Sequence, residues 1–299
     1  MRILVAYDGS ISADAAIEDL PRAGLPQRAE ALVVCVEHSG EVIHSKSTAS
    51  VESGEAKTIA AKGAERIHSY FPQWRVSSDA LCGSPARLLV EVSEQWHPDL
   101  FVIGCHGRSG MRRLFLGSVS WELIHSAPCS IRVARPGGAR NPHDPIRVVI
   151  GHDGSAEAGI VISSVAGRAW PEKTEAQIVS AIQTLVPVTT ALDASTFAQE
   201  PAYSVIREAD ERLRQRVGNI ASESANVLRR AGLITTTHLV DGDPRETILT
   251  AADIAKADTI FLGARGDGRM QRLLLGSVSS YVVTHAHCSV EVVRGNHAK

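Results

Sequence analysis

The chain has 299 residues, enough for two domains of ordinary size that each bury a hydrophobic core. Charged residues make up 21% of the sequence and the formal net charge is -2, so bulk charge predicts no nucleic-acid or membrane partner. The five cysteines show no CxxC spacing, which is typical of free thiols rather than of zinc or redox sites. The apolar run that ends at Tyr7 is too short for a signal peptide, and no stretch is long enough to span a membrane. We therefore expect a cytoplasmic protein.

The first half alternates short apolar runs with stretches of helical spacing. The runs are nearly continuous in apolar residues, as in strands that are buried on both faces of a sheet. In chain order the sequence predicts strand 3–8, helix 12–24, strand 31–36, helix 52–70, strand 75–81, helix 84–96, strand 99–104, helix 118–126 and strand 130–134. This alternation predicts an α/β domain with five strands in a mostly parallel sheet.

The second half repeats this pattern. Its predicted strands include Val148–Ile150, Ile178–Ala181, Ile260–Leu262 and Val290–Val293. A segment rich in proline and glycine, 137–145, suits a linker between one domain at 1–136 and another at 146–299. The fold class is therefore two tandem five-stranded parallel-sheet domains of Rossmann-like type.

The second half is longer than the first. Asp8 and Asp153 are 145 positions apart, whereas Gly83 and Gly242 are 159 apart, so the second half gains 14 residues between 181 and 242. We expect a loop over 189–201 and then a long charged helix over 205–230. Such a helix could form a lid, a partner surface or simply solvated packing, and the last interpretation is favoured.

One glycine pattern occurs in both halves at an offset of 159 positions. Each copy has Gly, two residues, Gly, nine residues, and Gly-Ser: Gly104, Gly107, Gly117 and Ser118, then Gly263, Gly266, Gly276 and Ser277. Each copy follows an apolar run and precedes a predicted helix. Glycine lets a ligand approach the main chain, and the unpaired N–H groups of a helix start favour an anion. The hydroxyls of Ser118, Ser120, Ser277 and Ser279 add donors there.

A tight turn with an N-cap would also place glycine and serine at such a junction. A cap fixes one or two positions and leaves a long loop free to vary, however, so the nine-residue spacer kept in both copies favours a ligand contact. Asp8 and Asp153 each end the first strand of their half, where they could cap the next helix or face a nucleoside. We favour the ligand contact. His106 and His125 lack a paired nucleophile and are interpreted as structural.

These residues resemble the universal stress protein family along nearly the whole chain. The resemblance implies Rossmann-like domains of the adenine nucleotide alpha hydrolase-like type. The carriers are Val5–Ser10, Gly104–Gly110, Gly117–Ser120 and the stretch from His125 to Cys129. The resemblance implies ATP, alone or as its Mg²⁺ complex, in both halves and a regulatory stress-response role. It implies a first pocket lined by Asp8, Val36, Gly104, Gly107, Gly117, Ser118, Val119 and Ser120. The second would be lined by Asp153, Ala181, Gly263, Gly266, Gly276, Ser277, Val278 and Ser279. Asp267 replaces Arg108 in the second loop, which implies a weaker site or a preference for metal-bound nucleotide.

The sequence leaves two other functions open. The chain has no P-loop lysine, so slow ATP hydrolysis at most is expected, but nucleotide-activating ligases and pyrophosphatases of related fold remain an alternative. A ligand-free scaffold is the other. In any of these cases we expect the halves to pair near Ile131 and Val290, so that one chain mimics a dimer, and a homodimer through edge strands is a further expectation. The sequence assigns no protein partner.

Overall fold

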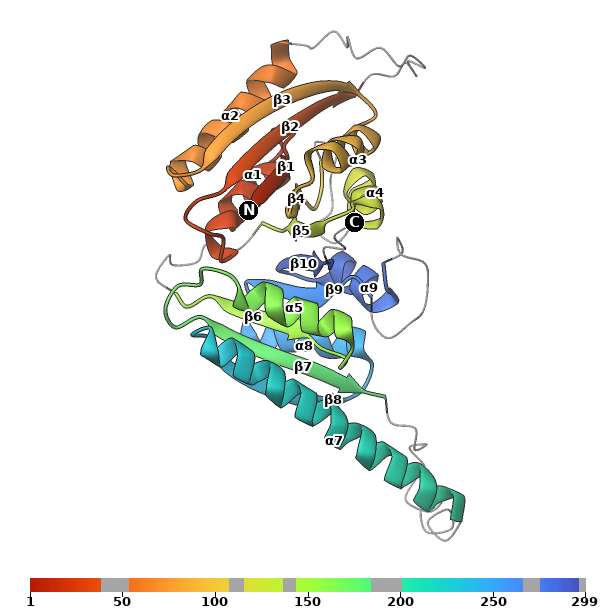
Figure 1. The fold of residues 1–299 in the computed structure, drawn as a ribbon. Helices are drawn as coiled ribbons and strands as arrows, with labels where there is room; N and C mark the ends of the chain where they lie inside the picture. The colour runs from red at the N-terminus through yellow and green to blue at the C-terminus, as the bar shows by residue number, and fades with distance from the viewer. Residues whose placement is uncertain (39–53, 108–115, 137–143, 184–200, 266–274, 296–299) are drawn as a thin grey trace.

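The computed structural model describes residues 1–38, 54–107, 116–136, 144–183, 201–265 and 275–295. Two α/β halves lie one above the other in Figure 1 and meet along β5 and β10. The first half consists of β1 (Arg2–Ala6), α1 (Ile11–Asp19), the 3-10 turn η1 (Leu20–Arg22), β2 (Glu30–His38), α2 (Gly54–Tyr70), β3 (Arg75–Gly83), α3 (Pro85–Trp96), β4 (Leu100–Gly104), α4 (Ser118–Ser126) and β5 (Ser130–Ala134).

The second half repeats this order. It consists of β6 (Arg147–Gly151), α5 (Ala156–Ala166), β7 (Glu175–Ile182), α7 (Pro201–Arg230), β8 (Ile234–Asp241), α8 (Pro244–Ala255), β9 (Thr259–Gly263), α9 (Ser277–His285) and β10 (Ser289–Val293). The predicted alternation of strand and helix is therefore confirmed. The expected linker lies mostly outside the described residues, and the proposed domain boundaries remain a prediction.

All the described strands form one sheet, in the order β3-β2-β1-β4-β5-β10-β9-β6-β7-β8. Within each half neighbouring strands are parallel, and β1 lies between β2 and β4. The chain therefore reverses its winding direction between β1 and β4, and the carboxyl ends of these two strands open the crevice where α/β folds bind ligands.

The two halves join by an antiparallel pairing of β5 with β10. Val290 faces Val133 and Val292 faces Ile131, as predicted. Because the last strands pair with each other inside the chain, the edges of the described sheet are β3 and β8. The expectation of a homodimer through edge strands must therefore refer to those two strands, and it stays a prediction.

The core is continuous across this junction. One buried cluster combines first-half side chains such as Leu123 and Ile131 with second-half side chains such as Ile260 and Val282. It fills the space between the sheet and helices α3, α4, α8 and α9. Separate clusters lie on the other face, under α1 and α2 in the first half and under α5 and α7 in the second. Both faces of the sheet are thus covered, which explains the continuous apolar runs of the strands.

Two local differences from the sequence expectations have clear causes. Helix α1 begins after Ser10, whose hydroxyl accepts from the N–H of Ala13 at 3.1 Å, so Ser12 lies inside the helix rather than before it. Helix α1 also ends at Asp19, where Pro21 follows in the η1 turn. The long second-half helix starts at Pro201, and its N-terminal end projects beyond the sheet in Figure 1. The loop expected over 189–201 falls outside the described residues up to 200.

None of the described helices combines the length and the apolar character needed to cross a lipid bilayer.

Candidate functional site

A cavity of about 560 Å³ opens at the carboxyl ends of β1, β2 and β4, beside the first turn of α4. It lies at the switch point where the strand order reverses. All eight predicted first-half site residues line it: Asp8, Val36, Gly104, Gly107, Gly117, Ser118, Val119 and Ser120. Residues far apart in the sequence thus meet in one place, and the volume lies within the range usual for small-molecule sites.

The main chain holds the glycine loop against the start of α4. The N–H of Gly117 donates to the carbonyl oxygen of Cys105 at 2.9 Å. The hydroxyl of Ser120 donates to the carbonyl oxygen of Gly104, also at 2.9 Å. Ser120 is buried while Ser118 is exposed. Ser120 therefore fixes the loop, whereas Ser118 and the N–H groups of the first helical turn face the cavity region where an anion would be held.

The glycines of this loop have different structural roles. A Cβ at Gly104 would lie 2.7 Å from the carbonyl carbon and oxygen of Ser12, so α1 packs directly on this glycine. A Cβ at Gly117 would have neighbours no nearer than 3.5 Å, which is ordinary contact. A Cβ at Gly107 would lie 3.2 Å from Oδ2 of Asp8. Gly104 is thus required by packing, and Gly107 and Gly117 keep the cavity wall bare.

Asp8 shapes the turn after β1. Its Oδ1 accepts from the N–H of Ser10 at 3.0 Å, while Ser10 caps α1. Asp8 is therefore not the helix cap itself. Its carboxylate lies on the cavity wall next to Gly107, so it stands between the loop and the rest of the cavity. Tyr7, just before it, donates to Asp14 at 2.5 Å and fastens the end of β1 to α1.

His106 was interpreted as a structural histidine, but it also lines the cavity. The main-chain N–H of His106 donates to the hydroxyl of Ser12 at 3.0 Å, and the ring Nδ1 lies 3.1 Å from Sγ of Cys105. Burial, with a smaller effect of Arg135, lowers the pKa of His106, so the ring is neutral at pH 7. Its Nε2 is buried with no hydrogen-bond partner among the described residues. A bound ligand could supply that partner.

Part of the cavity wall is apolar. Val34, Val36, Ala56, Ile59 and Leu89 line it, with Glu37 and Glu55 close by. Such a surface suits a flat ring with polar edges. Sequence reasoning identified Val36 but missed the contributions of α2 and α3, because neither helix carries a motif and only tertiary packing brings them here.

The second half repeats the loop geometry. The N–H of Gly276 donates to the carbonyl oxygen of Ala264 at 2.7 Å, and Ser279 donates to that of Gly263 at 2.7 Å. Oδ1 of Asp153 accepts from the N–H of Ser155 at 3.0 Å. Ala181 lies at the end of β7, and Ser277 and Val278 begin α9. Gly266 lies outside the described residues.

The side chains around this second loop differ, however. Glu157 occupies the position that Ser12 has in the first half, and its Cβ would lie 3.4 Å from a Cβ at Gly263. Arg265 replaces His106, and His152 replaces Tyr7 with its Nε2 3.1 Å from the hydroxyl of Ser224. A carboxylate and a guanidinium thus replace two uncharged side chains beside the glycine loop. The second half therefore keeps the main-chain hydrogen bonds of the loop but has different side chains around it.

Within the described part of the chain, no group of three or more His, Cys, Asp or Glu residues is arranged to hold a metal ion.

The fold and the site together define a duplicated α/β protein with a cavity at its switch point and a glycine loop on the cavity wall. The model of the universal stress protein family matches residues 1–135 and again 146–294. The chain therefore belongs to the universal stress protein family, with two copies of the family domain in tandem.

Individual relatives agree. A universal stress protein of Mycobacterium tuberculosis (strain H37Rv) is 28% identical over 224 residues, which cover 73% of this chain and 69% of the relative. One from Methanocaldococcus jannaschii is 31% identical over 103 residues, 34% of this chain and 61% of the relative. Among solved structures, a universal stress protein of Archaeoglobus fulgidus has a TM-score of 0.62 at 18% identity and covers 99% of this chain and 97% of its own. A functionally unknown Pseudomonas aeruginosa protein reaches 0.67 at 15%, covering 98% and 92%. These structures share the fold.

Proposed function

We propose that the first half binds ATP or a close adenine nucleotide and that the protein acts by binding rather than by metabolic turnover. The observation that carries this proposal is a single cavity that joins a bare helix start to an apolar wall. A nucleotide has an anionic tail and a flat ring, and these two surfaces complement them.

Within the cavity, the polyphosphate would rest on Gly107, Gly117 and Ser118, where main-chain N–H groups supply donors without a side-chain cation. The adenine ring would lie against Val36 and Ile59. Asp8, between these regions, would accept from a ribose hydroxyl, and the buried Nε2 of His106 would gain a polar partner. The chain offers no described metal cluster, so any Mg²⁺ would come with the nucleotide.

The second loop is proposed as a weaker site. Its helix start and hydroxyls match those of the first half, but Glu157 adds a carboxylate where the first half has the neutral Ser12. Repulsion between this carboxylate and a polyphosphate would lower the affinity, and the guanidinium of Arg265, which replaces the neutral His106, would offset part of this repulsion. A nucleotide whose charge is reduced by a bound cation would be the better ligand there.

Family membership supports a regulatory output in a stress response, and we propose that occupancy of the first cavity stabilises the conformation that a partner recognises. A ligand at 100 times its dissociation constant stabilises a fold by about 2.7 kcal/mol. Thermal-shift titration with ATP, ADP, AMP and GTP tests binding directly. Mass spectrometry of nucleotide retained through purification identifies the natural ligand.

Matched variants locate the site. In Gly117→Val the added side chain covers the N–H groups of the first helical turn, while the nearest neighbours leave room for its Cβ. We expect this variant to fold and to lose the adenine-nucleotide shift. Gly276→Val is the equivalent change in the second half and should retain the high-affinity shift. Absence of any shift in the unmodified protein would favour a scaffold. Sustained release of phosphate or pyrophosphate that depends on Asp8 would favour the ligase-like alternative.

A further inference from the structure

Two opposite charges meet at the centre of the pairing between the halves. Arg132 on β5 and Glu291 on β10 are directly opposed, and both side chains are 0% exposed. Nη1 of Arg132 lies 3.2 Å from Oε2 of Glu291. These two residues are 159 positions apart, the same offset that relates the two glycine loops, so they occupy one equivalent position in the duplicated halves. The axis of the pseudo-dimer therefore passes between the cationic side chain of Arg132 and the anionic side chain of Glu291.

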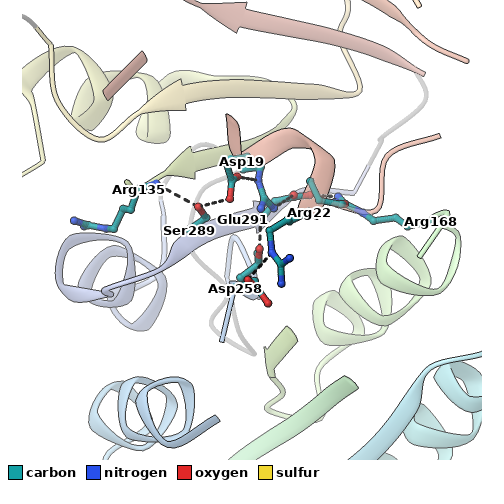
Figure 2. Close-up of polar contacts among 10 residues, drawn as sticks. Asp19, Arg22, Arg135, Arg168, Asp258, Ser289 and Glu291 are labelled. Carbon is teal, nitrogen blue, oxygen red and sulfur yellow. Dashed lines mark hydrogen bonds and ion pairs between the residues drawn. The ribbon is translucent and has the colours of Figure 1, made fainter. Parts of the chain in front are cut away.

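Each of these charges has further partners. Nε of Arg132 donates to Asp19 at 2.6 Å and Nη2 donates to the hydroxyl of Thr259 at 2.7 Å. Arg168 donates to the other carboxylate oxygen of Glu291. Figure 2 shows Asp19, Glu291 and Arg168 converging between β10 and the end of α1. Burial alone would lower the pKa of Arg132, but the carboxylates of Asp19 and Glu291 raise it above its usual range. Arg132 therefore keeps its proton, and acidic and basic side chains alternate along Asp19, Arg132, Glu291 and Arg168.

Two arginine contacts at the periphery of this interface are nearly the same from either side. Nη2 of Arg135 donates to the carbonyl oxygen of Val283 at 2.7 Å, and Nη2 of Arg294 donates to that of Ile124 at 2.5 Å. Both pairs of donors and acceptors are related by the 159-position offset. The arginine contacts at the periphery are thus reciprocal, and they would form equally well between two first halves or two second halves.

The residues on the axis, in contrast, distinguish a pairing of unlike halves from a pairing of like halves. Two first halves would bring Arg132 against a second copy of itself, with Leu100 in place of the acceptor Thr259. Two second halves would bring Glu291 against Glu291. In such pairings Arg132 would keep Asp19 and Glu291 would keep Arg168 from its own half. Two buried like charges would nevertheless face each other across the axis, whereas the observed pair is satisfied on both sides.

We infer that the face formed by β5 and α1 is selective for a second-half partner, because pairing of like halves would replace the bonds of Arg132 to Glu291 and Thr259 by two facing like charges. A second copy of the chain can then join through β5 and β10 only by exchanging halves, so that a first half again meets a second half. This inference does not depend on the nucleotide proposal.

Two full-length variants test this selectivity. Arg132→Glu places two carboxylates on the axis, and Glu291→Arg places two guanidinium groups there. Neither chain can form the native axis by itself. In a mixture, the first half of Glu291→Arg and the second half of Arg132→Glu keep all the native partners, including Asp19, Thr259 and Arg168. Native mass spectrometry after co-refolding, with one variant ¹⁵N-labelled, distinguishes the mixed complex from both homodimers.

We expect a 1:1 mixed complex that is at least about tenfold more abundant than either homodimer, since two buried like charges oppose each of the latter. Homodimers of either variant in equal abundance would overturn the inference. So would two monomeric variants with the unfolding midpoint of the original protein. If a variant precipitates alone, recovery of soluble mixed complex on co-refolding supports the inference. If co-refolding also fails, the neutral pair Arg132→Gln and Glu291→Gln gives the same comparison, with the same preference expected and equal abundance overturning it.

Discussion

The hydroxyl of Ser120 donates to the carbonyl oxygen of Gly104 at 2.9 Å, and Ser279 repeats this bond to Gly263 at 2.7 Å. Each bond joins the first turn of a helix to the end of the neighbouring strand. It holds the helix start at a fixed distance from the strand end. The conserved spacing between the two copies therefore has a structural component as well as the ligand component inferred from the sequence.

Ser118 and Ser120 should consequently behave differently. Ser120→Ala leaves a buried carbonyl without its donor, so we expect the free energy of unfolding to fall by about 1 kcal/mol. Ser118→Ala changes an exposed side chain at the cavity and should leave stability within about 0.5 kcal/mol while weakening ATP binding. Urea unfolding and calorimetric titration measure the two effects. Equal losses of stability in both variants would contradict this division of roles.

Gly104 and Gly117 form a second contrasting pair. Gly104→Ala forces the added methyl group against the main chain of Ser12, and we expect a loss of about 1–3 kcal/mol, typical of overpacking. Gly117→Ala has room for its methyl group and should unfold like the original protein. Thermal denaturation of both variants without ligand is the measurement. A stable Gly104→Ala variant would show that α1 can move away from β4 at little expense.

Gly24 lies where the two halves touch. Its φ of +63° is left-handed, and an added Cβ would lie 2.7 Å from ring atoms of Trp170 in the other half. Gly24→Ala combines backbone strain with a clash, so we expect a loss of at least about 1 kcal/mol. Gly159→Ala, where no neighbour lies within 4 Å of the added Cβ, is the matched control. It should not lose stability, because alanine favours the helix in which Gly159 lies.

Acid should destabilise the second half through His152. This ring is buried, its Nδ1 accepts from the N–H of Gly154 at 3.2 Å, and its Nε2 contacts Ser224. Burial lowers the pKa of His152 below 6.5, against the opposing effect of Asp153. The unfolded chain then binds a proton more readily than the folded one. The stabilising contribution is present above pH 6.5 and is lost as the pH falls through the folded pKa.

The variant His152→Gln removes this titration. We expect its free energy of unfolding to vary less steeply than that of the original protein between about pH 7 and pH 5, where a histidine titrates. His106 has a shift of the same sign, but it is present in both proteins and cancels in the comparison. Parallel pH profiles from chemical denaturation would contradict a neutral buried His152.

Much of the fold could be predicted because the evidence for it is local. Apolar runs such as 31–36 and 99–104 have the period and length of buried strands, and offsets of 145 positions before the insertion and 159 after it relate each element to its copy. The cavity wall made by the loop was predictable for the same reason. The positions of Ile59 and Leu89 in the cavity wall could not be predicted, because their helices reach the cavity only through tertiary packing.

The pair of Arg132 and Glu291 is visible in the sequence, although it is not among the expectations above. Arg132 and Glu291 are charged residues inside strands that are otherwise buried, at equivalent positions of the duplication, and with opposite sign. Together these facts indicate a pair across the junction. The partners Asp19 and Arg168 could not be found in this way, because they come from the end of α1 and the segment after α5, whose approach to the axis depends on how the halves dock.

Covalent continuity between β5 and β6 has a thermodynamic consequence. When two separate subunits associate, they lose translational and rotational freedom, and their pairing weakens on dilution. Here the partner domain is tethered, so its effective concentration is set by the connecting segment and is independent of how much protein the cell contains. The ten-stranded sheet should therefore persist at protein levels at which a comparable two-subunit assembly would dissociate.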